Sequence, residues 1–133
     1  MALVVDSSAW VAILRLEPDA QSLLETIASA DTVHLSAATY VEVGAVIDAA
    51  RDPIASRRFD ELLELFQVVI EPVTAAQARR ARDAYRDFGR GSGHGAQLTY
   101  GDVFSYALAT DLRAPLLFKG DDFTHTDVSA AGA

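Results

Sequence analysis

The chain has 133 residues, half of them hydrophobic, which is enough for one compact domain, and we expect a single domain over residues 1–133. It contains no cysteine, so a disulfide scaffold, a thiolate metal site and a cysteine nucleophile are excluded. The formal net charge of −8 argues against a protein that coats nucleic acid through bulk electrostatics, and it favours a bound divalent cation or a basic protein partner.

Short apolar runs alternate with segments of helical periodicity along the chain. The runs are continuous rather than alternating, which is typical of strands buried on both faces of a parallel sheet. The predicted strands are 2–5, 32–35, 68–70 and 116–118. The predicted helices are 9–14 with Ser8 as its cap, 19–28, 38–50, 54–66, 74–88 and 99–111. This alternation predicts an α/β fold with helices on both faces of the sheet.

No apolar run approaches the roughly 20 residues that a membrane-spanning helix needs. The first residues, Met1 to Asp6, lack the basic start and the longer apolar stretch of a signal peptide. We therefore expect a cytoplasmic protein with no membrane partner.

Acidic residues stand at equivalent places in this predicted pattern. Asp6 directly follows the first strand, Glu42 lies early in the helix after the second strand, and Asp102 lies at the start of the last helix. The pair Asp121 and Asp122 follows the last strand. Because ligands of open α/β sheets bind beyond the carboxyl ends of the strands, we expect these acids to converge at one edge.

A cluster of carboxylates without histidine or cysteine is typical of a Mg²⁺ or Mn²⁺ site rather than a zinc site. His34, His94 and His125 show no spacing that would make a histidine-based site. Divalent ions held in this way support hydrolysis of a phosphodiester, since they activate water and offset charge on the phosphate. The acids therefore point to a metal-dependent nuclease.

Each acid also has a purely structural interpretation. The segments Thr39–Glu42 and Thr99–Asp102 both match a capping box, and Asp6 fits a helix cap. An aspartate after Gly120 is an ordinary turn residue. The metal interpretation gains support because Glu42 shares its predicted helix face with residues typical of a core, namely Ala45, Val46 and Ala49.

Two further segments are candidates for contact with RNA. The fifth helix has a predicted apolar stripe of Ala78, Ala81, Tyr85 and Phe88 beside a basic stripe of Arg79, Arg82 and Arg86. The glycine-rich segment Gly89–Gly95 follows it and predicts a mobile loop. Such an arginine stripe is, however, more often a solvated helix face than a track for RNA.

Four segments resemble the motifs of the PIN-domain ribonucleases, and specifically of the VapC-type toxins of bacterial toxin–antitoxin pairs. These segments are Val4–Ala9, Leu35–Val43, Leu98–Ala109 and Leu116–Phe123, so the resemblance covers nearly the whole chain. It implies a three-layer α/β/α sandwich with a central parallel sheet. It also implies a homodimer, Mg²⁺- or Mn²⁺-dependent cleavage of RNA, and inhibition by a cognate VapB-type antitoxin whose tail occupies the active-site groove.

The resemblance also assigns roles to residues. Asp6 and Asp102 would be the primary metal ligands, Glu42 would join them or hold metal-bound water, and Asp121 would be the fourth acid with Asp122 as the alternative. Ser8 and Lys119 are secondary candidates together with Asp122. The hydroxyl of either Ser7 or Ser8 would hydrogen-bond metal-bound water or a phosphate. Lys119, where many relatives have threonine, would hold a phosphate or pair with the adjacent aspartates.

Two other functions are compatible with these residues. Asp6 after a strand and Lys119 after another loosely match an enzyme that transfers phosphate through an aspartyl phosphate. A degenerate α/β binding module without catalysis would use the acids as caps and the arginines as a protein interface.

Overall fold

The computed structural model describes residues 1–131, which form a parallel four-stranded sheet flanked by six helices. The strands are β1 (Ala2–Val5), β2 (Thr32–Ser36), β3 (Val69–Glu71) and β4 (Leu116–Leu117), in the spatial order β3-β2-β1-β4. Every pairing is parallel, as predicted. The predicted domain range of 1–133 extends two residues beyond the described part.

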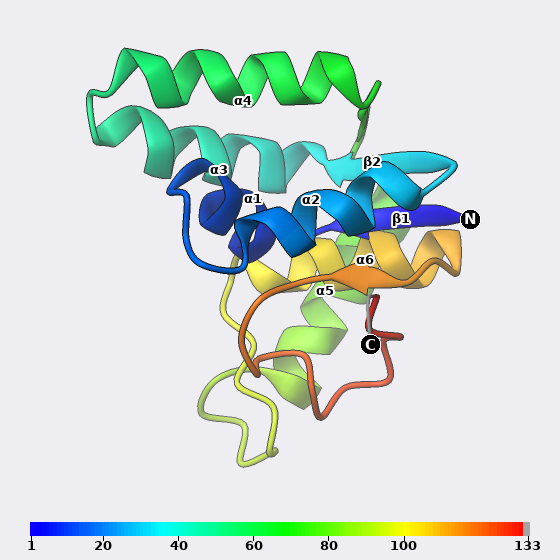
Figure 1. Cartoon of the computed structure of the whole chain (residues 1–133). Coiled ribbons are helices and arrows are strands. Elements are labelled where there is room, and N and C mark those ends of the chain that lie inside the picture. Colours follow the sequence, from blue (N-terminus) through cyan, green and yellow to red (C-terminus); the bar gives the residue numbers. More distant parts are fainter. Residues whose placement is uncertain (132–133) are drawn as a thin grey trace.

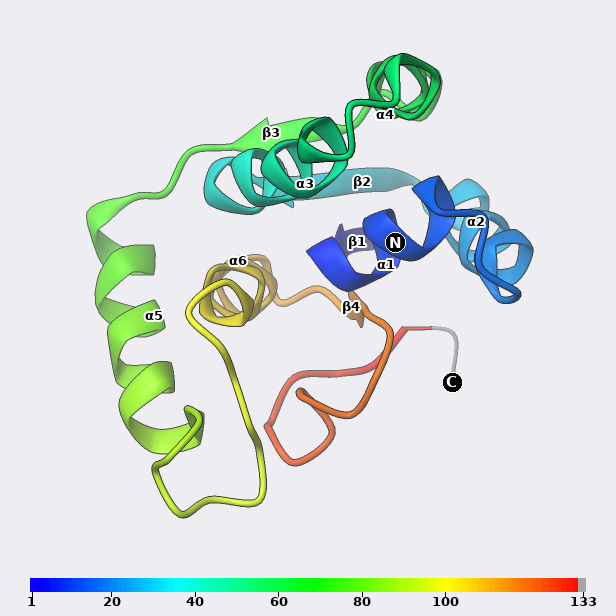
Figure 2. The same ribbon diagram turned by 90° about the vertical axis from the view of Figure 1, so that its left-hand side faces the viewer.

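The helices confirm the predicted element order, with most boundaries within a few residues of expectation. They are α1 (Ser7–Leu14), α2 (Ala20–Ser29), α3 (Ala37–Ala49), α4 (Pro53–Leu65), α5 (Ala75–Phe88) and α6 (Asp102–Leu112). In Figure 1, α3 and α4 lie side by side as an antiparallel pair. Figure 2 shows α5 standing outside α6, with which it makes the most extensive helix–helix packing of the described residues.

Two hydrophobic cores lie on opposite faces of the sheet, which makes the molecule a three-layer α/β/α sandwich. Alternate residues of β1 enter different cores, since Leu3 and Val5 pack with α1 to α4 while Val4 packs with α5 and α6. Trp10 is fully buried in the first core and meets the ring of Phe59 edge-on at 5.8 Å. Burial of this strand on both sides explains its continuous apolar sequence.

β3 departs from the prediction that every strand is buried on both faces. It lies at the edge of the sheet and is hydrogen-bonded only to β2, and Val69 and Ile70 are each 44% exposed. An apolar run of three residues cannot by itself distinguish an edge strand from a central one. None of the described helices is long and apolar enough to cross a membrane.

The strand order places a topological switch point between β1 and β4. The chain moves outward from β1 through β2 to β3 and then returns to the other side of β1 to form β4. The loops that leave β1 and β4 therefore diverge, which opens a crevice at the carboxyl ends of these strands. Asp6 and the Asp121-Asp122 pair lie on these two loops.

Candidate active site

Asp6 lies at the carboxyl end of β1 and is completely buried. Its backbone N–H extends the sheet by donating to the carbonyl of Leu117 at 2.9 Å. Its Oδ2 accepts from both the backbone N–H (3.1 Å) and the hydroxyl (2.7 Å) of Ser8, and its Oδ1 accepts from the Ser105 hydroxyl at 2.6 Å. Burial raises the pKa of Asp6, and these hydrogen bonds oppose that rise.

Glu42 reaches the same region from α3. Its Oε1 is buried and has no hydrogen-bond partner among the described residues, although a hydrogen bond from the Ser7 side chain reaches the carboxylate. Burial raises the pKa of Glu42, and the negative charge of Asp6 raises it further. That electrostatic coupling indicates that the two carboxylates are neighbours, and a buried oxygen without a partner indicates a place for a cation.

Asp102 begins α6 and lies beside both Asp6 and Asp122. Burial raises the pKa of Asp102 to about 7, and proximity to Asp6 and Asp122, which shares a hydrogen bond with it, adds to the rise. The opposing influence is the backbone N–H of Thr99, which donates to Asp102 Oδ2 at 2.9 Å. The cluster therefore holds a proton near neutral pH when no cation is present.

The two aspartates after Gly120 occupy different positions. Asp122 is half-buried and contacts Asp102, whereas the side chain of Asp121 is exposed. The sequence prediction favoured Asp121 as the fourth acid. The contacts of Asp122 favour the alternative assignment.

The secondary candidates Ser8 and Lys119 support the loops that carry the acids. The Ser8 hydroxyl bonds Asp6 and also accepts from the backbone N–H of Lys119 at 3.0 Å, so it links the ends of β1 and β4. The Lys119 amine forms ion pairs with Glu17 and Asp19. The expected pairing of Lys119 with Asp121 or Asp122 is not the one that forms.

The capping interpretations have mixed outcomes. Asp6, not Ser8, is the N-cap of α1, so the predicted start of that helix was wrong by two residues. The N-cap of α3 is Ser36, so Thr39 lies inside the helix and no capping box forms with Glu42. In contrast, Thr99 and Asp102 do form reciprocal capping-box hydrogen bonds, and Asp102 serves both its helix and the acidic cluster.

The prediction that Glu42 shares a core face of α3 with Ala45, Val46 and Ala49 was also wrong. The core face of α3 consists of Thr39, Val43 and Ile47, whereas Ala45, Val46 and Ala49 are exposed. Glu42 is sheltered instead by the start of α6. A Cβ added to Gly101 would lie 2.2 Å from Glu42 Oε2, so the absence of a side chain there gives the carboxylate its space.

Sequence reasoning missed the hydroxyls of Ser105 and Thr39 as part of the site. Both residues are buried, and their hydroxyls lie 3.3 Å apart next to Asp6. The available signal was spacing, because Ser105 lies three residues after Asp102 and Thr39 three residues before Glu42, which puts each hydroxyl on the same helix face as its acid.

The donor set suits a hard divalent cation. The described side chains that meet at the cluster offer carboxylate and hydroxyl oxygens. The unpartnered Glu42 Oε1 and the raised pKa values of three acids are features that a cation would relieve. Within residues 1–131, however, no three acidic or histidine side chains already form a closed metal cage. A bound ion would therefore draw the carboxylates together.

The basic stripe of α5 is exposed as predicted, but the apolar stripe was displaced. The buried residues of α5 are Gln77, Ala81 and Ala84, so Ala78 and Tyr85 face outward. Arg86 pairs with Asp83 and Asp87 on the same helix. Arg79 and Arg82 are exposed on the helix that packs against α6.

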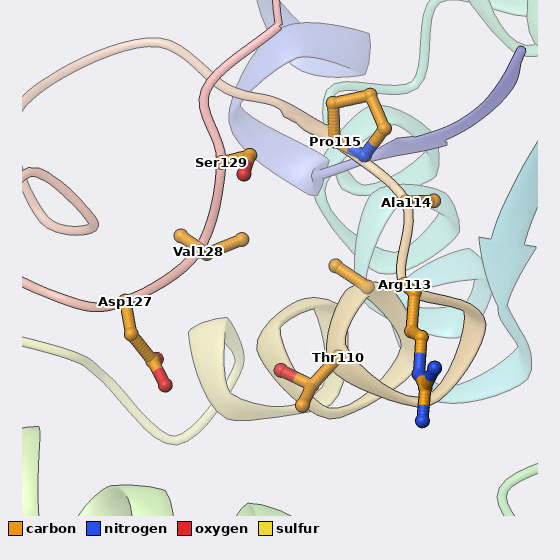
Figure 3. Close-up of a pocket in the computed structure, with 8 residues that line it drawn as sticks. Thr110, Arg113, Ala114, Pro115, Asp127, Val128 and Ser129 are labelled. Carbon is orange, nitrogen blue, oxygen red and sulfur yellow. The ribbon is translucent and has the colours of Figure 1, made fainter.

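A separate cavity of about 300 Å³ lies at the opposite end of the sheet, where α6 ends and β4 begins. Figure 3 shows Arg113, Thr110 and Asp127 around it. Asp127 accepts a hydrogen bond from the Tyr106 hydroxyl, and the described residues that line the cavity include none of the clustered acids. This cavity is therefore distinct from the carboxylate site.

Comparison with known proteins gives consistent matches. Residues 3–129 match the family model "PIN domain". Ribonuclease VapC28 of Mycobacterium tuberculosis is 57% identical over 129 residues, covering 97% of each chain. The solved structure of M. tuberculosis VapC20, described as a sarcin–ricin-loop-cleaving toxin, has a TM-score of 0.76, 17% identity and 95% coverage of each chain. The solved structure of a toxin–antitoxin complex from Klebsiella pneumoniae has a TM-score of 0.71 and 17% identity, and the match covers 94% of this chain and 92% of that chain.

Proposed function

The chain belongs to the PIN-domain family and, within it, to the VapC ribonucleases, and from this premise we propose that it is the toxin of a toxin–antitoxin pair, an endoribonuclease dependent on Mg²⁺ or Mn²⁺. The observation that carries this proposal is the convergence of Asp6, Glu42, Asp102 and Asp122 at the carboxyl ends of β1 and β4. These acids come from four separate segments. Burial raises the pKa values of Asp6, Glu42 and Asp102, and a neighbouring carboxylate adds to the rise for Glu42 and Asp102.

Asp6, Asp102 and Glu42 would hold the metal. Asp6 would bind through Oδ1, because Oδ2 already accepts two hydrogen bonds from Ser8. Asp102 would bind through Oδ1, because its Oδ2 accepts from Thr99. Glu42 would contribute the buried Oε1 that has no other partner among the described residues.

A bound Mg²⁺ or Mn²⁺ would supply charge compensation at the scissile phosphate and lower the pKa of a water. Asp122, which lies beside Asp102, would orient the attacking water. The hydroxyl of Ser8 holds Asp6 and the loop after β4 together, which keeps Asp122 beside Asp102. Arg79, Arg82 and the loop Gly89–Gly95 would guide the RNA strand toward this edge.

The partners follow from the family and from charge. We infer a basic antitoxin segment that binds over the acidic site, because the chain has a net charge of −8 and a structural neighbour is a toxin–antitoxin complex. We also expect a homodimer, as the family resemblance implies. Co-expression with a VapB-type antitoxin, followed by size-exclusion chromatography with light scattering, tests both expectations.

Cleavage of a fluorescent RNA tests the activity. The wild-type protein should cleave the RNA with Mn²⁺ or Mg²⁺, and cleavage should stop when the metal is chelated. The variants Asp6→Asn and Asp102→Asn should each cleave at least about 10²-fold more slowly. Asp60→Asn, an exposed acid on α4, is the control and should cleave like the wild type. Full activity of both site variants would refute the assignment.

The lack of a closed metal cage favours one alternative, a binding module without catalysis. That alternative predicts no cleavage and no change in melting temperature when Mn²⁺ is added. A metal-dependent nuclease should instead show a higher melting temperature with Mn²⁺, because the metal binds the folded state and not the unfolded state.

A further inference from the structure

A chain of buried hydroxyl groups connects the elements that carry the acids. The Ser105 hydroxyl on α6 donates to Asp6 Oδ1 at 2.6 Å, and Thr39 Oγ1 on α3 lies 3.3 Å from Ser105 Oγ. Asp6 is fully buried, and Thr39 and Ser105 are each 1% exposed. Bulk water therefore cannot substitute for any member of this chain.

The direction of these hydrogen bonds follows from the chemistry of Asp6. A carboxylate that binds a cation is ionised and can only accept, so in the metal-bound protein the single Ser105 proton points toward Asp6, as it does in the structure. Ser105 Oγ is then left as an acceptor, and Thr39 must be the donor between the two hydroxyls. The series of hydrogen bonds runs from Thr39 through Ser105 to Asp6, and the hydrogen bond that Ser105 accepts strengthens the one that it donates.

The hydroxyls lie one helical turn from the other acids. Thr39 precedes Glu42 by three residues on α3, and Ser105 follows Asp102 by three residues on α6. Residues three apart share a helix face. A contact that fixes Thr39, Ser105 and Asp6 relative to one another therefore also fixes where Glu42 and Asp102 lie relative to Asp6.

Counting acceptor sites shows what remains for a ligand. Each carboxylate oxygen accepts about two hydrogen bonds or metal contacts. Asp6 Oδ2 uses both sites on Ser8, and Oδ1 uses one on Ser105. One acceptor site is left on Oδ1, and the rotation of the carboxylate about its own axis determines where that site points.

We propose that Ser105, supported by Thr39, is a positioning residue that turns Asp6 so that the remaining acceptor site on Oδ1 faces the divalent cation. This inference rests on the proposed function, because it needs a metal at the carboxylate cluster. Ser105 does not contact substrate and acts only through Asp6.

Mn²⁺ affinity, measured by isothermal titration calorimetry, tests the proposal without relying on activity. Ser105→Ala should weaken Mn²⁺ binding by about 10- to 100-fold, the range found for residues that orient metal ligands. Ser105→Thr, which keeps the hydroxyl, should recover most of the affinity. If Ser105→Ala does not fold, the nearly isosteric Ser105→Cys replaces it, since a thiol is a weak donor.

A double-mutant cycle tests the role of Thr39. Thr39→Val preserves shape but removes the donor to Ser105, so it should weaken Mn²⁺ binding by a smaller factor than Ser105→Ala. In the Ser105→Ala background Thr39→Val should have no further effect on Mn²⁺ affinity, because the chain is already broken. Equal and additive losses from the two substitutions would overturn the proposed chain.

Thr110→Val is the matched control, because Thr110 lies on the same helix and its hydroxyl bonds only the carbonyl of Tyr106 among the described residues. It should leave Mn²⁺ affinity unchanged. The inference would be overturned if Ser105→Ala bound Mn²⁺ with wild-type affinity. A variant whose sole defect was a lower melting temperature of the metal-free protein would show that Ser105 has a merely structural role. A wild-type protein that binds no Mn²⁺ and cleaves no RNA would instead overturn the proposed function itself.

Discussion

Replacing Gly101 by alanine should impair RNA cleavage while leaving the fold intact. Gly101 lies at the start of α6 with φ −68° and ψ −38°, a conformation that alanine adopts freely. The added Cβ, however, would lie 2.2 Å from Glu42 Oε2, 2.7 Å from Cδ and 2.8 Å from Oε1. The whole carboxylate group would have to move.

The size of that movement sets the expected loss. Ordinary contact with a Cβ begins at 3.4 Å, so the nearest oxygen of Glu42 must retreat by about 1.2 Å. A misplacement of roughly 1 Å at an active site costs about 10²-fold in rate. The clash involves the end of a flexible side chain, so the free energy of unfolding should stay within about 1 kcal/mol of the wild type.

The assay compares cleavage of a fluorescent RNA at saturating Mn²⁺ with the melting temperature of the same preparation. Gly44→Ala on α3 is the control, since its Cβ would meet only Asp48 Oδ2, at 3.8 Å. It should raise the free energy of unfolding by about 0.5–1 kcal/mol and leave cleavage unchanged. The double variant Gly101→Ala/Glu42→Asp should recover part of the rate, because the shorter side chain relieves the clash.

Two results would refute this reasoning. Wild-type cleavage by Gly101→Ala would mean that the position of Glu42 does not matter for the reaction. A large fall in the melting temperature would mean that the glycine serves the fold rather than the carboxylate.

The remaining predictions concern charge and metal. The pKa of Asp102 is raised from 3.8 to about 7, mainly by burial, so between these pH values the native state keeps a proton that the unfolded chain has released. The metal-free protein should therefore lose stability as the pH rises from about 4 to about 7. Denaturant titrations should show that the free energy of unfolding of Asp102→Asn depends less on pH over this range. At pH 8 that variant should melt above the metal-free wild type, whereas a clear fall would make capping its main role. Asp122→Asn should weaken Mn²⁺ binding in calorimetry more than Asp121→Asn, because Asp122 contacts Asp102 and Asp121 is exposed. A Mn²⁺ concentration of 100 times Kd should stabilise the wild type by about 2.7 kcal/mol, and Asp6→Asn should abolish most of the associated rise in melting temperature.

The sequence predicted the fold well because its strongest signals are local. Continuous apolar runs identified β1 and β2, and Asp52-Pro53 marked the break between α3 and α4. These signals depend on neighbouring residues within one element. Once the strands were predicted to be parallel, their carboxyl ends were expected to lie at the same edge of the sheet. This logic places Asp6 and the Asp121-Asp122 pair at one edge. Asp102 follows no strand, so its convergence with Asp6 also required its helix to begin at that edge.

The finer features of the site depend on packing between distant segments. Glu42 is sheltered by Gly101, which is 59 residues away in the chain, and no periodicity within α3 reports that contact. Ser105 reaches Asp6 across 99 residues. The choice between Asp121 and Asp122 depends on how the loop after Gly120 turns, which adjacent identical residues cannot reveal.

The most direct test of the carboxylate site is anomalous diffraction from crystals soaked in Mn²⁺. An anomalous peak within about 2.0–2.3 Å of oxygens from both Asp6 and Asp102, with Glu42 or Asp122 completing the shell, is the result expected here. Crystals that bind Mn²⁺ elsewhere, or that show no peak between Asp6 and Asp102 at saturating Mn²⁺, would contradict the assignment of this edge of the sheet as the metal site.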